Sequence, residues 1–129
     1  MDMSNPDTRP VYLNLLKIRQ PVTALLSIGH RISGIVLFLV LPVALFLLEY
    51  SLKGPEEYAA VVRLFGSPAG VFAGLVLGWM LLLHLFAGVR FLLIDMDWGV
   101  ELRTARQSAS MALWAASGVT LILALFYLW

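Results

Sequence analysis

The sequence predicts an all-α integral membrane protein with three transmembrane helices, its N-terminus in the cytoplasm and its C-terminus on the opposite side. Of its 129 residues, 60% are hydrophobic and only 13% are charged, which is more apolar than a typical soluble domain. Three long stretches also lack Lys, Arg, Asp and Glu, namely residues 32–48, 64–89 and 107–129. Because a transmembrane helix needs about 20 apolar residues, each stretch indicates one span.

The first helix must begin before its charge-free stretch, because residues 32–48 alone are slightly short for a span. Pro21 suits the first turn of a helix, where its missing N–H is not needed. We therefore expect a helix over 21–50, with the motif "SIGHRISG" inside it. Residues 1–20 lack the apolar region of a signal peptide and are expected to form a cytoplasmic N-terminal segment.

The remaining elements follow from breakers and charges. Gly54 and Pro55 interrupt the chain, so we expect a connecting loop at 51–67, then a second helix at 68–95, a cytoplasmic loop at 96–106 and a third helix at 107–129. Seven Lys or Arg residues lie on the N-terminal flank and around the second connection, against two in the first. The positive-inside rule then places the N-terminus in the cytoplasm. A net charge of +1 gives no argument for nucleic acid, and zero cysteines exclude iron–sulfur ligation by this chain.

Polar residues mark one face of the first helix. Ser27, His30, Arg31 and Gly34 fall within an arc of roughly 100°. A hydroxyl and a guanidinium one turn apart can bind one small polar ligand, and the imidazole can reach a carboxylate or a metal. Ser33 points elsewhere and is expected to bond back to its own helix. The alternative is that Arg31 only extends to the headgroups, although its depth of roughly 13 Å along the helix argues for a cavity or a partner.

The second helix contains one ionisable side chain within the span, His84. Such a residue is a functional candidate, although it can also serve only as a hydrogen-bonding contact between helices. Gly88 lies one turn further on the same face and is expected to leave a flat gap, as a haem plane would require. Arg90 points about 120° away and is expected to anchor at the interface. His30 is the only other histidine, so a six-coordinate b-type haem would use both or borrow a ligand from a partner.

Rows of small residues predict close helix packing. They comprise Gly70, Gly74 and Gly78 in the second helix and Ala112, Ala115 and Ala116 in the third. The pattern is weakly specific and does not say whether the neighbouring helix belongs to this chain or to another.

Two longer motifs resemble a known family. "RPVYLNLLKIRQPVTALLSIGHRISG" contains Arg-Pro, a spaced aliphatic and then Ser-x-x-His-Arg-x-Ser-Gly, and "HLFAGVRFLLID" contains His-x-x-x-Gly-aliphatic-Arg-aromatic followed by an Asp. Both resemble signatures of the cytochrome b membrane-anchor subunits of bacterial succinate dehydrogenase. The resemblance covers nearly the whole chain. The chain departs from the family pattern at Ile94, where an aromatic residue is common, and at Asp97, where a small residue is common.

The resemblance implies a role for each matching residue. Ser27 and Arg31 would line a ubiquinone site, His84 would be an axial ligand of the haem b iron, and His30 with Arg31 would contact the haem propionates. Asp95 matches an acid near the cytoplasmic end, to which we assign no definite role.

The resemblance also implies a setting. The chain would lie in the bilayer of the bacterial inner membrane and share haem b with a second hydrophobic anchor subunit. A flavoprotein subunit and an iron–sulfur subunit would oxidise succinate and deliver electrons to ubiquinone. Two alternatives stay open: the anchor of a fumarate reductase, and a non-haem structural anchor or small transporter component. The absence of an inverted repeat disfavours a transporter.

Overall fold

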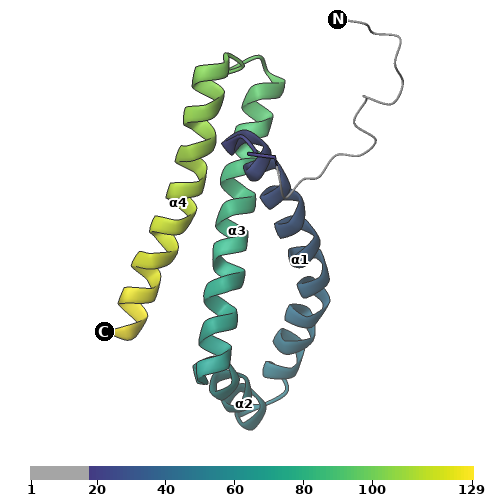
Figure 1. The fold of residues 1–129 in the computed structure, drawn as a ribbon. Helices are drawn as coiled ribbons and strands as arrows, with labels where there is room; N and C mark the ends of the chain where they lie inside the picture. Colours follow the sequence, from purple (N-terminus) through teal and green to yellow (C-terminus); the bar gives the residue numbers. More distant parts are fainter. Residues whose placement is uncertain (1–17) are drawn as a thin grey trace, which may run out of the picture.

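The computed structural model describes residues 18–129, apart from the side chain of Leu128. These residues form four helices, α1 (Val22–Ser51), α2 (Pro55–Gly66), α3 (Pro68–Asp95) and α4 (Leu102–Leu128), and no strand (Figure 1). Within this described part, α1, α3 and α4 are the three helices long and apolar enough to cross a membrane. The all-α fold with three spans is confirmed, while the cytoplasmic position of the N-terminus stays a prediction. Most of the expected N-terminal segment lies outside the described residues.

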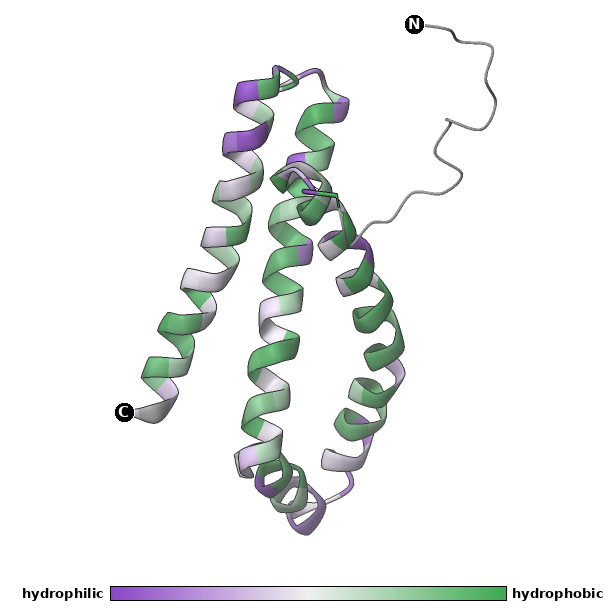
Figure 2. Ribbon diagram, in the orientation of Figure 1, coloured by the Kyte–Doolittle hydropathy of each residue, from purple (hydrophilic) through white to green (hydrophobic). Residues whose placement is uncertain are grey.

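The helix bounds differ from the expected ones by more than one residue in two places. The connection expected at 51–67 contains a helix of its own, α2, and α4 begins at Leu102 instead of 107. The start of α1, the end of α3 and the start of α4 lie at one end of the bundle, and α2 lies at the other (Figure 1). Hydrophilic residues gather at these two ends, with mostly hydrophobic helix between them (Figure 2).

Local chemistry explains where the helices begin. The carbonyl of Pro21 accepts from the amides of Ala24 and Leu25, at 2.9 and 3.1 Å. Ser67 caps α3, because its Oγ accepts from the Gly70 amide at 3.1 Å while Pro68 occupies the first turn. Pro21 and Pro68 therefore lie at the starts of α1 and α3, where a backbone N–H has no hydrogen-bond partner within the helix.

The turn from α3 to α4 is a Schellman motif. The Trp98 amide donates to the Leu93 carbonyl and the Asp97 amide donates to the Ile94 carbonyl, both at 2.9 Å. Asp97 adopts a left-handed conformation with φ 63°, and Gly99 follows with φ 77°. This turn returns the chain so that α4 packs along α3.

The buried core is small and lies where α1, α3 and α4 meet. Its members are mostly small side chains, which allow the helices to approach closely. They are Leu26, Leu83, Ala87, Ala109, Ala112 and Ala116. Ala112 and Ala116 thus pack as expected, whereas Ala115 is exposed. Most large apolar side chains point outward, as expected of a surface that meets lipid or other subunits.

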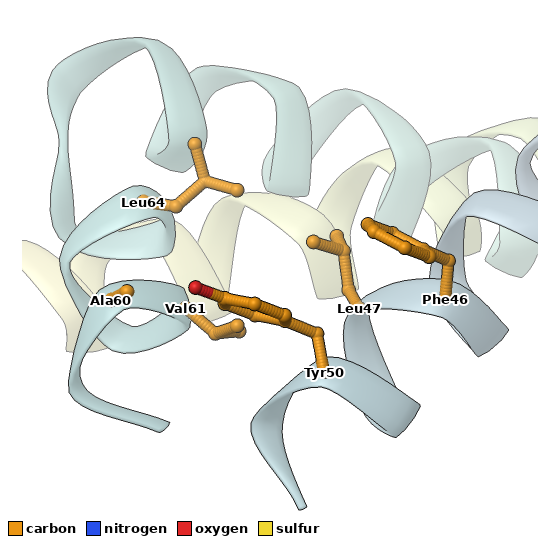
Figure 3. A pocket seen from close by; sticks show the side chains of 6 residues that line it. All are labelled: Phe46, Leu47, Tyr50, Ala60, Val61 and Leu64. Carbon is orange, nitrogen blue, oxygen red and sulfur yellow. The ribbon is translucent and has the colours of Figure 1, made fainter. Parts of the chain in front are cut away.

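The opposite end is organised by α2. A hollow of about 280 Å³ lies between α1 and α2, lined by Phe46, Leu47, Tyr50, Ala60, Val61 and Leu64 (Figure 3). A Cβ atom on Gly70 would collide with the backbone carbonyl of Leu64, so this glycine allows the start of α3 to pack against the end of α2. Gly74 and Gly78, by contrast, have no atom within 4 Å of such a Cβ. Only the first glycine of the row packs within the described chain.

Candidate functional site

The two histidines meet where α1 packs against α3. Their ring centroids are 4.2 Å apart and their planes differ by 10°, so the imidazoles are stacked. The ring of Phe91, which belongs to α3, lies beside the His30 ring. The two ring centroids are 5.2 Å apart and the planes are tilted by 59°. Residues 54 positions apart in the sequence therefore form one cluster.

Hydrogen bonds determine which nitrogen of His84 is protonated. Nδ1 of His84 lies 3.1 Å from the backbone carbonyl oxygen of His30 and 3.3 Å from Oγ of Ser33. The Ser33 hydroxyl donates to the same carbonyl at 2.9 Å. Because a carbonyl oxygen can only accept, Nδ1 must carry the hydrogen, so in the neutral tautomer of His84 the nitrogen without a hydrogen is Nε2.

Ser33 was expected to bond only to its own helix. That bond is present, but the side chain is also 1% exposed and contacts His84. No signal in the sequence identifies this second contact, because it depends on which helix covers that face of α1.

Glycines allow the imidazoles to approach the helices. A Cβ atom on Gly34 would lie 2.9 Å from Cε1 of His84, and one on Gly88 would lie 3.4 Å from Nε2 of His30. Each imidazole thus rests on a glycine of the other helix. The expectation of a vacant flat gap at Gly88 is wrong for this chain, because the His30 ring occupies the space.

Ser27 and Arg31 lie one turn apart on α1 and do not join the histidine stack. Ser27 is half-buried and Arg31 is exposed. Their spacing agrees with one ligand bound by both side chains, and the exposure of Arg31 leaves it accessible to a ligand or a partner subunit. The described residues contain no group of three or more His, Cys, Asp or Glu side chains placed to hold a metal ion.

Comparison with known proteins identifies the family. Residues 5–125 match the family described as succinate dehydrogenase/fumarate reductase transmembrane subunit. The chain belongs to this family. It is 35% identical over 125 residues to the succinate dehydrogenase cytochrome b556 subunit of Coxiella burnetii, covering 94% of this chain and 97% of the relative. The corresponding subunit of Paracoccus denitrificans is 32% identical over 121 residues, covering 94% and 92%.

The resemblance predicted from the two motifs is confirmed by these matches. Together with three apolar helices of sufficient length, they show that this transmembrane subunit is a multi-pass membrane protein. The family includes both succinate dehydrogenases and fumarate reductases, and it does not by itself assign any residue of this chain a role.

One residue of this transmembrane subunit has an unexpected position. Arg90 is only 7% exposed, and its guanidinium donates to Oγ of Ser108 at 3.0 Å and to the carbonyl of Ala105 at 2.9 Å. The expectation that Arg90 anchors at the interface is therefore wrong, because the side chain joins α3 to α4. The helical angle showed that Arg90 points away from His84, but it did not show that α4 lies in that direction.

Proposed function

We propose that this chain is the haem-binding cytochrome b anchor of a succinate:quinone oxidoreductase in a bacterial inner membrane. The observation that carries the proposal is the position of His84, whose Nδ1 is held by α1, so that Nε2 is the ring nitrogen left to bind iron. The chain would share haem b with a second hydrophobic anchor subunit. A flavoprotein subunit and an iron–sulfur subunit would oxidise succinate to fumarate and deliver two electrons.

The described residues fit one axial ligand of a haem. A neutral imidazole binds iron through an unprotonated ring nitrogen, and a hydrogen bond from its other nitrogen orients the ring. His84 has such a hydrogen bond, because Nδ1 donates to the His30 carbonyl at 3.1 Å, and its Nε2 is the nitrogen that would bind the iron. Haem b, when bound, supplies one-electron redox chemistry near the quinone.

The stacking of the two histidines supports a second ligand from a partner. If His30 and His84 both held the haem iron, the porphyrin would have to lie between their rings. His30 and His84 instead face each other at 4.2 Å, which leaves no room for a porphyrin between them. His30 is then available, with Arg31, to hold haem propionates by charge-assisted hydrogen bonds.

Ser27 and Arg31 are proposed to bind ubiquinone. The Arg31 guanidinium would donate hydrogen bonds to a quinone oxygen and stabilise the negative charge that develops as the quinone takes two electrons and two protons. The Ser27 hydroxyl, one turn away on α1, would orient the same molecule. Such charge stabilisation is strongest in a site shielded from water, which a partner subunit covering Arg31 would provide.

The relatives favour succinate oxidation over fumarate reduction, because both are named as succinate dehydrogenase cytochrome b556 subunits. Those names also favour a haem protein over a structural anchor that lacks haem. The structural anchor without haem is one outcome of the first experiment below.

The first test is a reduced-minus-oxidised visible spectrum of the complex purified through a tag on this chain. We expect a sharp b-type signal that is weakened or altered in His84→Leu. Leu85→Ala is the matched control, because Leu85 is the exposed neighbour on the same helix turn. A complex without any haem signal would refute the haem proposal, and an unchanged signal in His84→Leu would refute this ligand.

The second test separates quinone reduction from succinate oxidation. Arg31→Leu is expected to lower ubiquinone reduction strongly while succinate oxidation by an artificial acceptor continues. Arg103→Leu removes another exposed arginine, outside the proposed site, and is the control for surface charge. Normal ubiquinone turnover in Arg31→Leu would contradict the assignment.

A further inference from the structure

We propose that Ser33, Gly34 and the backbone carbonyl of His30 form a seat on α1 that fixes the orientation and tautomer of the His84 imidazole. In this inference the three groups of the seat are positioning elements and not ligands. The inference rests on the proposed function, because it assigns the presentation of the His84 ligand nitrogen to α1.

The polar part of the seat determines the tautomer. Both neighbours of Nδ1, the His30 carbonyl at 3.1 Å and the Ser33 hydroxyl at 3.3 Å, lie on α1. Since the Ser33 hydrogen is directed to that carbonyl at 2.9 Å, its oxygen presents a lone pair to Nδ1. An unprotonated Nδ1 would face the carbonyl oxygen without a hydrogen between them. The arrangement therefore requires a hydrogen on Nδ1 and leaves Nε2 as the nitrogen that would bind the metal.

The apolar part of the seat limits where the ring can lie. Cε1 of His84 would be 2.9 Å from a Cβ on Gly34, a distance that real Cβ atoms do not tolerate, so only glycine permits this position. The stacked His30 ring covers one face of His84 at 4.2 Å. Nδ1, Cε1 and one ring face are thus all fixed by α1, although His84 itself belongs to α3.

This division of roles has a consequence for the metal. Hydrogen bonds donated by the second nitrogen of a ligating histidine increase the basicity of the ligand, and their loss typically weakens metal binding by about 10-fold to 100-fold. A more basic axial ligand stabilises ferric over ferrous iron. Weakening the hydrogen bonds to Nδ1 should therefore raise the midpoint potential of the haem, and moving the ring should reduce haem retention.

The chain offers a matched control for Gly34. Gly29 is also on α1 and also faces α3, but a Cβ there would meet Cδ2 of the core residue Leu83 at 3.3 Å, which requires a shift of a few tenths of an ångström in a leucine and none in an imidazole. Gly29→Ala and Gly34→Ala therefore make the same chemical change at the same helix pair. Only Gly34→Ala displaces the imidazole.

The experiment uses the assembled complex, purified through a tag on this chain. Haem per complex, the paramagnetic resonance spectrum of the oxidised haem and its midpoint potential are measured in Gly34→Ala, Gly29→Ala, Ser33→Ala, Ser33→Thr and His84→Ala. We expect Gly34→Ala to weaken haem retention by about 10-fold or more, and Gly29→Ala to resemble the parent. Ser33→Ala should raise the potential, and Ser33→Thr, which keeps the hydroxyl, should restore it.

The outcomes separate this inference from the proposed function. If His84→Ala keeps the parent haem signal, His84 is no ligand and the proposed function fails. If His84→Ala changes the signal but Gly34→Ala retains haem as Gly29→Ala does, the seat is overturned while the ligand assignment stands. Should Gly34→Ala fail to assemble, Ser33→Ala decides, because it adds no atoms; an unchanged potential and resonance spectrum in that variant would refute the seat.

Discussion

The two ends of the helical bundle are held together differently. At the histidine end, where α1 starts, α3 ends and α4 starts, small core residues and polar side chains link all three helices (Figure 1). Arg90 and Trp79 both donate hydrogen bonds from α3 to serines of α4. This end therefore has internal contacts that fix side chains relative to one another.

The α2 end depends on fewer contacts within the chain. Pro42 lies inside α1, and Figure 1 shows α1 bowing away from α3 before it reaches α2. Large side chains along this helix, such as Phe38 and Phe46, are exposed, at 75% and 60%, as are Trp98 and Leu102 at the other end of the bundle, at 70% and 67%. The comparison shows that the buried core lies where α1, α3 and α4 meet, near the two histidines, whereas α2 contains no buried residue.

Arg90→Ala is the strongest test of the histidine end. It removes two hydrogen bonds between α3 and α4 together with the packing of a side chain that is 7% exposed. Since buried hydrogen bonds from charged groups contribute about 1.5–3 kcal/mol, we expect the complex to lose about 3 kcal/mol of stability. The measurement is the temperature at which the detergent-purified complex unfolds and aggregates.

Two further variants separate the contribution of the Arg90 hydrogen bonds from those of its volume and its charge. Arg90→Met keeps most of the volume, so its smaller loss measures the hydrogen bonds without the cavity. Arg106→Ala removes an exposed arginine from the same region and should have little effect. Equal unfolding temperatures for Arg90→Ala and Arg106→Ala would show that α4 does not depend on the Arg90 contact.

Gly70→Ala tests whether the α2 end has any packing as strict as that of the histidine end. Its Cβ would collide with the backbone at Leu64, which cannot move without shifting the end of α2. We expect a loss of about 1–3 kcal/mol, the usual cost of overpacking. Gly74→Ala has open space and better helix propensity, so its unfolding temperature should not fall. A loss as large in Gly74→Ala would contradict the picture of a sparsely packed end.

The sequence predicts the spans well because its signal there is long and chemical. Charge-free stretches of apolar residues require helices in a membrane, whatever their neighbours are. The connection at 51–67 carries a weaker signal: Gly54, Pro55 and several charges suggest a loop, yet Pro55 at the first position and two glutamates in the first turn also favour the start of a helix. The sequence therefore contained a signal for the start of α2, but the connection was still expected to be a loop.

The site could be predicted only in part. Its residues were identified because polar side chains are unusual in a span, and this holds for His30 and His84. Helical angles give the face on which a residue lies but not the helix that covers it. The stacking of the histidines, the contact of Ser33 with His84 and the burial of Arg90 against α4 all depend on that tertiary information.

Trp79→Phe addresses a single polar contact within the span. Nε1 of Trp79 donates to Oγ of Ser117 at 3.2 Å, which links α3 to α4. Hydrogen bonds between membrane helices contribute about 0.6 kcal/mol on average, so we expect a loss near that value. Trp114→Phe is the control, because that indole is 77% exposed. Ser117→Ala should match Trp79→Phe, and the double variant should lose no more than either one; additive losses would show that the two side chains act independently.

Asp97→Gly should have an effect of similar size and opposite sign, because it should be stabilising. Asp97 has φ 63° at the position of the Schellman motif that normally holds glycine, and its carboxylate lies beside the negative end of the α3 dipole. Relief of both effects should add about 0.5–1 kcal/mol to the stability of the complex. Asp97→Asn separates them, since it removes the charge and keeps a side chain that tolerates this conformation. Gly99→Ala, with φ 77°, should instead destabilise the turn. If Asp97→Gly lowers the unfolding temperature, the carboxylate must have a stabilising contact outside this chain, and the histidine end would then depend on partners as the α2 end does.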